Sequence, residues 1–217
     1  MIKPVRWNTF IPDFIRIQIG FVLFGLAITL MIRGGIGTSA WVVLEAALAE
    51  RLGITVGTMT VIMGFLVLGS AVAMREKMGW GTLANILSIG PWVDMWNSFM
   101  PSVTDNLPLQ VAMLLSAVFL MGLGSAIYIG VDAGAGPRDS LMLAIKRTTG
   151  VSIRLSRAII EVTVVTLGWL LGGPAGIGTL VYALLIGPSV QWGFKIFNVQ
   201  PHKEEEVVLA GVEGGAE

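Results

Sequence analysis

The chain has 217 residues, of which 54% are apolar and 13% are charged, with a mean hydropathy of +0.80 and no formal net charge. Soluble domains carry roughly 25% charged residues, so half that share, together with apolar runs about 20 residues long, indicates a bilayer protein. The lack of cysteine excludes disulfides and thiol chemistry, and the single histidine, His202, lies in a polar C-terminal stretch, which excludes histidine catalysis within the membrane.

The chain begins with a short basic segment and continues as one membrane unit. Residues 1–14 contain Lys3 and Arg6 and lack a cleavable signal pattern, so we expect a cytoplasmic N-terminal segment. Six apolar segments follow, each long enough to cross a bilayer. These expected spans are 15–33, 56–74, 80–100, 109–131, 154–171 and 177–197.

Two short helices are expected, each directly after a glycine-rich break. The first covers 39–52 and ends at Gly53, and the second covers 138–149 and ends at Gly150. A helix of about 14 residues reaches only about 21 Å, whereas the hydrocarbon core is about 30 Å thick. We therefore expect both short helices to be re-entrant or interfacial. The alternative, in which both cross the bilayer and the chain has eight spans, stays open.

The sequence repeats itself at an offset of 97 residues. Residues 37–97 align without a gap on 134–194, with 15 identities in 61 positions. We expect the densest identities to be structural, because small side chains let helices pack closely; a break or kink at each Gly-Pro pair is the alternative. These repeat residues are Gly79, Gly81, Thr82, Gly90 and Pro91 in the first copy and Gly176, Gly178, Thr179, Gly187 and Pro188 in the second.

The duplication predicts an all-α membrane protein built as an inverted internal repeat. Each copy has three expected spans, an odd number, so the two copies lie in opposite orientations. With the N-terminus inside, twelve of the 14 basic residues face the cytoplasm and only Arg33 and Arg51 lie outside, which follows the positive-inside rule. The expected units are 1–14, cytoplasmic; 15–100, first repeat; 101–108, external loop; 109–199, second repeat; and 200–217, a disordered acidic cytoplasmic tail.

The best candidate for a binding site is the pair of glycine-rich breaks. Helix N-termini expose free N–H groups that attract anions, and transporters place paired broken helices near the bilayer midplane. The alternative is a turn that packs a short helix, with Arg138 snorkelling to the cytoplasmic surface. The candidate substrate-binding residues in the breaks are Gly37, Thr38, Ser39, Gly134, Gly136, Pro137, Arg138 and Asp139.

Glu161 joins this candidate set because it lies inside an expected span. An ionisable side chain within the membrane is a functional hypothesis by default. The alternative is a local ion pair with Arg157, which lies one helical turn earlier in the sequence.

Several runs of the second copy carry a family resemblance. Gly134-Ala-Gly-Pro-Arg-Asp-Ser-Leu141, Arg147-Thr-Thr-Gly150, Gly176-Ile-Gly-Thr-Leu180 and Ile186-Gly-Pro188 resemble the YczE/YyaS/YitT group of bacterial integral membrane proteins. The first-copy run Gly37–Leu44 is similar to that group's Gly-Thr-Ser-Pro-Trp-Asp pattern but has Ala40 and Val42 where Pro and Asp are expected. The resemblance implies a multi-pass protein of the bacterial plasma membrane and implies little about activity.

The function expected from the sequence is a small secondary transporter or permease, with its site between the two copies. The alternative is a non-transporting accessory or regulatory membrane protein. An enzyme is not expected, because no nucleophile–base pair is recognisable. We expect no cofactor, no metal and no nucleic acid. The expected partners are the lipid bilayer and a small polar or anionic substrate, and the sequence indicates no oligomeric state.

Overall fold

The computed structural model describes residues 5–75, 79–134 and 136–199, without the side chains of Ile153 and Arg154. The expected acidic tail at 200–217, the first four residues of the N-terminal segment and most of the charged turn at 75–77 lie outside the described residues.

The described residues form eight α-helices and no strand, so the fold is all-helical. The helices are α1 (Phe10–Gly34), α2 (Ala40–Leu52), α3 (Val56–Ala73), α4 (Trp80–Phe99), α5 (Leu107–Gly130), α6 (Pro137–Thr149), α7 (Ile153–Leu170) and α8 (Ile177–Ile196).

The expected helix boundaries agree with these helices closely. The largest difference is at α1, which begins at Phe10 rather than at residue 15. Pro12 lies in the first turn of this helix, where its missing N–H would have no intrahelical partner in any case. The short helices α2 and α6 end at Gly53 and Gly150, which adopt the left-handed conformation as expected for C-terminal glycines.

Four helices are long and apolar enough to cross a membrane: α1, α3, α5 and α8. The other two expected spans are helical, but their sequences are more polar. α4 carries Asn85, Asp94 and Asn97, and α7 carries three charged residues. Six spans therefore stay a prediction, whereas four candidate spans are observed.

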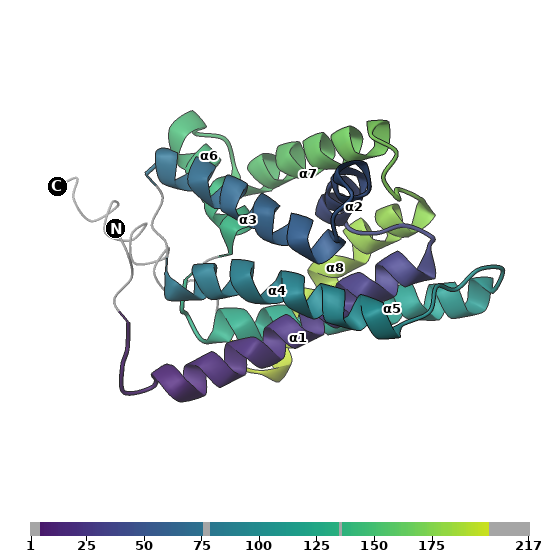
Figure 1. Ribbon diagram of the computed structural model, residues 1–217. Helices are drawn as coiled ribbons and strands as arrows, with labels where there is room; N and C mark the ends of the chain where they lie inside the picture. Colours follow the sequence, from purple (N-terminus) through teal and green to yellow (C-terminus); the bar gives the residue numbers. More distant parts are fainter. Residues whose placement is uncertain (1–4, 76–78, 135, 200–217) are drawn as a thin grey trace.

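The helices pack in two layers, and α8 packs on α5 (Figure 1). α1, α4 and α5 lie side by side in one layer, and α2, α3, α6 and α7 form the other. Gly20 of α1 packs beside Gly124 of α5, and Gly34 packs beside Met113, so α1 and α5 run antiparallel. The short helices exchange partners between the two halves of the chain, because α2 packs on α7 and α6 packs on α3.

Contacts between the two halves recur at the same offset of 97 residues as the sequence identities. Gly81 N donates to Ala133 O at 3.0 Å, and Gly178 N donates to Ile36 O at 2.8 Å. A side chain at these helix starts would collide with the opposite backbone: a Cβ on Gly178 would lie 2.8 Å from Ile36 O. The glycines that begin α4 and α8 therefore allow a backbone–backbone contact, as their expected structural role requires.

The helix break at each Gly-Pro pair, which was the alternative to a packing role, is wrong, because α4 continues through Pro91 and α8 continues through Pro188. Proline is tolerated inside a membrane helix where neighbouring helices support the backbone. Gly90 packs so closely on α3 that an added Cβ would lie 2.3 Å from Gly57 O. At Gly187 an added Cβ would have no neighbour within 4 Å. Close packing at this position is therefore limited to the first copy.

Two alanine substitutions at repeat-related positions test this difference. Gly90→Ala is expected to destabilise the folded protein by about 1–3 kcal/mol through overpacking, whereas Gly187→Ala is expected to be neutral or to stabilise its helix by up to about 1 kcal/mol. Thermal unfolding in detergent, followed by tryptophan fluorescence, measures both. Equal midpoints for the two variants would contradict the packing described here.

Candidate functional site

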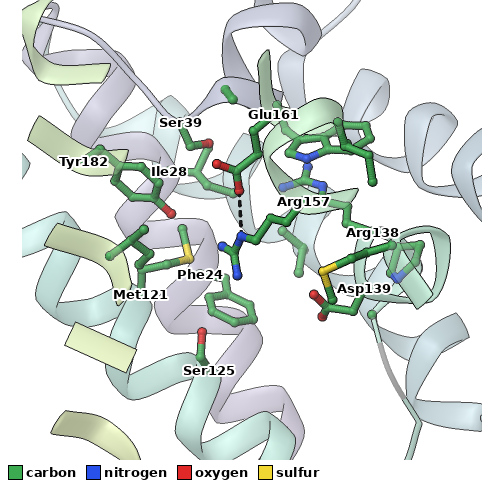
Figure 2. Close-up of a pocket in the computed structure, with 18 of the residues that line it drawn as sticks. Phe24, Ile28, Ser39, Met121, Ser125, Arg138, Asp139, Arg157, Glu161 and Tyr182 are labelled. Atoms are coloured by element: carbon green, nitrogen blue, oxygen red, sulfur yellow. Dashed lines mark hydrogen bonds and ion pairs between the residues drawn. The ribbon is translucent and has the colours of Figure 1, made fainter. Parts of the chain in front are cut away.

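A cavity of about 470 Å³ lies between the two halves of the chain. Its walls come from α1, α2, α3 and α4 on one side and from α5, α6, α7 and α8 on the other, and Figure 2 shows the side chains that project into it. The volume falls in the range of small-molecule sites, about 300–1,000 Å³.

The lining of this cavity follows the repeat. Each of the lining residues from the first half has a counterpart 97 positions later that also lines the cavity. The cavity therefore lies where equivalent parts of the two halves meet. The matched pairs are 24 with 121, 28 with 125, 39 with 136, 40 with 137, 41 with 138, 60 with 157, 64 with 161, 85 with 182, 86 with 183 and 89 with 186.

The chemistry of the matched positions differs between the halves. Trp41, Thr60 and Gly64 in the first half correspond to Arg138, Arg157 and Glu161 in the second. Asp139 also lines the cavity. The charged residues of the lining thus all come from the second half, while the first half supplies mainly apolar and small side chains.

Both short helices direct their N-terminal ends at the cavity. Ser39 precedes α2 and Gly136 precedes α6, with nearly the same backbone angles: φ −64° and ψ 154° against φ −62° and ψ 158°. Pro137 opens α6, where its fixed φ suits the first helical position. Because helix N-termini carry partial positive charge, both ends favour a negatively charged group in the cavity.

Arg138 joins the two short helices across the cavity wall. Its Nη2 donates to Glu45 Oε1 at 2.5 Å, and its guanidinium carbon lies 4.9 Å from the ring centroid of Trp41. Glu45 is fully buried and also accepts from Thr60 Oγ1 at 2.8 Å. A buried carboxylate thus holds the Arg138 guanidinium at the cavity wall, while 38% of the side chain is exposed. Snorkelling of Arg138 to the cytoplasmic surface stays an alternative prediction.

Arg157 and Glu161 form an ion pair on the α7 face that lines the cavity. Arg157 Nε donates to Glu161 Oε1 at 2.9 Å, one helical turn apart. Figure 2 shows the guanidinium of Arg157 projecting toward Phe24, Met121 and Ser125. The predicted local ion pair is confirmed, and it lies in the cavity together with the other candidate residues.

The structure divides the candidate residues into two groups. Ser39, Gly136, Pro137, Arg138, Asp139 and Glu161 line the cavity. Gly37, Thr38 and Gly134 lie behind it and hold the helix starts: Thr38 N donates to Thr179 Oγ1 at 3.2 Å. Gly37 and Gly134 share a positive φ, 130° and 125°, and both pack on the glycine-rich start of the opposite helix. Their role is structural, because the left-handed conformation and the close backbone approach both require glycine.

Sequence reasoning missed several residues of this site. Glu45 was not selected, because nothing in the sequence of α2 links it to a residue 93 positions later. Trp41 lines the cavity as the counterpart of the candidate Arg138, so the offset of 97 could have identified it. Arg157 and Tyr182 also line the cavity, but their counterparts Thr60 and Asn85 were not candidates, so the repeat gave no signal for them. Over the described ranges, no three His, Cys, Asp or Glu side chains gather closely enough to hold a metal ion.

Comparisons with known proteins identify the family. The model of a family of unknown function, DUF6198, matches residues 11–195. The chain belongs to this family. No solved structure matches the chain.

Three relatives cover most of the chain. The chain is 33% identical over 170 residues to the uncharacterized membrane protein YczE of Bacillus subtilis, and this alignment covers 77% of the present chain and 79% of YczE. It is 31% identical over 189 residues to an uncharacterized protein of Haemophilus influenzae, with 85% and 86% covered, and 31% identical over 173 residues to the uncharacterized protein YyaS of Bacillus subtilis, with 78% and 86% covered. These relatives confirm the family resemblance, and with the apolar helices they identify a membrane protein.

The ion pair between α2 and α6 can be tested with a double-mutant cycle. Arg138→Met leaves the buried Glu45 carboxylate without its cation and is expected to cost about 3 kcal/mol of unfolding free energy or more. Glu45→Met copies the residue at the matched position, Met142. The double variant, Glu45→Met with Arg138→Met, is expected to regain most of the loss, because no buried charge remains. Additive losses in the double variant, measured by thermal unfolding, would argue against a coupled pair.

Proposed function

We propose that the protein is a small secondary transporter or permease of the bacterial plasma membrane, which moves a small polar or anionic solute through the cavity between its two halves. The observation that carries the proposal is the cavity itself, lined by matched positions from both halves. Transporters with inverted repeats bind their substrates at such a repeat interface, beside the ends of broken helices.

The proposed architecture has six spans arranged as two inverted three-helix copies, with both termini in the cytoplasm. Three observations support it: α1 and α5 run antiparallel, the cavity lining is matched at 97 residues, and α4 and α7, with 20 and 18 residues, are as long as the apolar helices α8 and α3. Asn85 of α4 and the pair of Arg157 and Glu161 of α7 line the cavity, which fits spans with one face toward it, because ionisable residues in membrane helices face the protein interior.

The proposed mechanism is a rocking of the two halves around the cavity. The contacts that join the halves at the helix starts are few and repeat-related: Gly81 to Ala133 at one end and Gly178 to Ile36 at the other. Opening one of these contacts while keeping the other would expose the cavity to one side of the membrane at a time. Inverted copies make the two open states similar in energy, because each copy takes the conformation of the other.

Flux measurements test the transport proposal. The protein in proteoliposomes is expected to take up at least one solute from a radiolabelled panel of amino acids, carboxylates and sugars. Arg157→Gln is expected to lower this uptake about ten-fold or more, because it removes the charge of a cavity residue. Arg16→Gln is the matched control, since Arg16 is exposed and outside the cavity lining. A folded protein that moves no solute of the panel and co-purifies with a stoichiometric partner would favour the accessory role instead.

The inverted arrangement is tested by single cysteines in the natural cysteine-free background. Arg75 and Gly172 lie in matched exposed turns after α3 and α7, both with positive φ, 62° and 86°. In intact cells, a membrane-impermeant maleimide is expected to label Gly172→Cys, and Arg75→Cys only after permeabilisation. Labelling of both variants from the same side would rule out the inversion.

A further inference from the structure

The cavity presents one positive and one negative group side by side, and each keeps unused hydrogen-bonding capacity. Arg157 uses its Nε to bind Glu161 Oε1. Among the described residues, no group accepts from the Nη1 or Nη2 of Arg157, and none donates to Glu161 Oε2. The terminal edge of the guanidinium and one carboxylate oxygen are therefore available to a ligand.

The two available groups match two different charges on one small molecule. The Nη1–Nη2 edge of an arginine binds a carboxylate through two parallel hydrogen bonds. The second oxygen of Glu161 can accept from an ammonium group. Since Arg157 and Glu161 touch each other, a carboxylate and an ammonium bound to them must also lie close together, as they do when both are attached to one carbon atom.

The pairing of charges in the cavity points in the same direction. Arg138 is paired with the buried Glu45 and Arg157 with Glu161, so neither arginine of the lining leaves an uncompensated positive charge. The pair on α7, with its two charges separated, favours a ligand that is itself net neutral with separated charges. An anion or a cation would leave one of the two charged groups of the α7 pair with a like-charged neighbour.

Apolar side chains form much of the remaining wall. Phe24, Ile28 and Met121 surround the space into which Arg157 projects (Figure 2), and Ile86, Ile89 and Ile186 add to the apolar lining. The uncharged polar residues of the lining are Ser39, Thr60, Asn85, Ser125, Thr179 and Tyr182. Burying an apolar ligand group against the apolar side chains is favourable.

From these observations we infer that the cavity binds a small amphipathic zwitterion, an α-amino acid with an apolar side chain. Arg157 holds its carboxylate, Glu161 accepts from its ammonium group, and the apolar wall holds the side chain. This inference deepens the proposed transport function and rests on it for its biological meaning, while the binding itself is measured separately.

Binding to the purified wild-type protein in nanodiscs tests the inference directly. Isothermal titration calorimetry is expected to detect at least one of alanine, valine, leucine, methionine and phenylalanine. The matching primary amine, which lacks the carboxylate, and the matching carboxylic acid, which lacks the ammonium group, are each expected to bind about ten-fold more weakly or worse. Equal binding of the amino acid and its deaminated acid, or binding of none of the five, overturns the inference.

Two conservative variants locate the two charges. Arg157→Lys keeps the positive charge but cannot form the two parallel hydrogen bonds of a guanidinium to a carboxylate, so it is expected to weaken amino-acid binding about ten-fold. Glu161→Gln is expected to abolish the preference for the amino acid over its deaminated acid. Arg16→Lys and Glu50→Gln, both exposed and outside the cavity lining, are matched controls that should leave binding unchanged. If a variant fails to fold, as seen by gel filtration, the wild-type comparison of ligands decides alone.

The outcomes separate the inference from the proposed function. Selective binding of an amino acid without uptake into proteoliposomes would support the site and contradict the transporter. Uptake of a different solute, with no amino-acid binding, would support the transporter and overturn the inferred ligand class.

Discussion

Two backbone hydrogen bonds join the halves of this protein, one from Gly81 to Ala133 and one from Gly178 to Ile36. Each sets the start of a long helix against the glycine-rich break of the opposite half, at a distance that only glycine permits. The breaks in turn set the N-terminal ends of α2 and α6, which line the cavity. The position of the cavity therefore depends on small residues that make no contact with any ligand, and their packing is what the recurring Gly-x-Gly-Thr pattern encodes.

The two halves supply matched positions to the cavity lining but differ in their charges. The matched positions of the cavity carry Thr60 and Gly64 on one side and Arg157 and Glu161 on the other. Matched positions of the lining thus carry different functional groups in the two halves. Charge in a membrane interior is costly unless it is paired, and here each arginine of the lining has a carboxylate in contact: Arg138 with Glu45, and Arg157 with Glu161.

The extent to which the sequence predicts this structure follows the range of the interactions involved. Apolar runs, glycine stops and the 97-residue repeat are local or periodic signals, and they predicted the helices within a few residues. The ion pair of Glu45 with Arg138 depends on how α2 and α6 meet in space, so no local sequence pattern predicts it. The continuation of α4 through Pro91 agrees with the expected span of 80–100, whereas the close contact of Gly90 with Gly57 depends on how α3 and α4 meet in space.

The long sequence distance between Glu45 and its partner Arg138 has a consequence for the order of folding events. Glu45 is made 93 residues before Arg138, so at about 5–20 residues per second the ribosome needs about 5–20 s to supply the partner. During that interval the Glu45 carboxylate lacks the arginine that pairs with it in the folded protein. The packing that brings Glu45 to Arg138 therefore belongs to a step of folding after α6 has been synthesised.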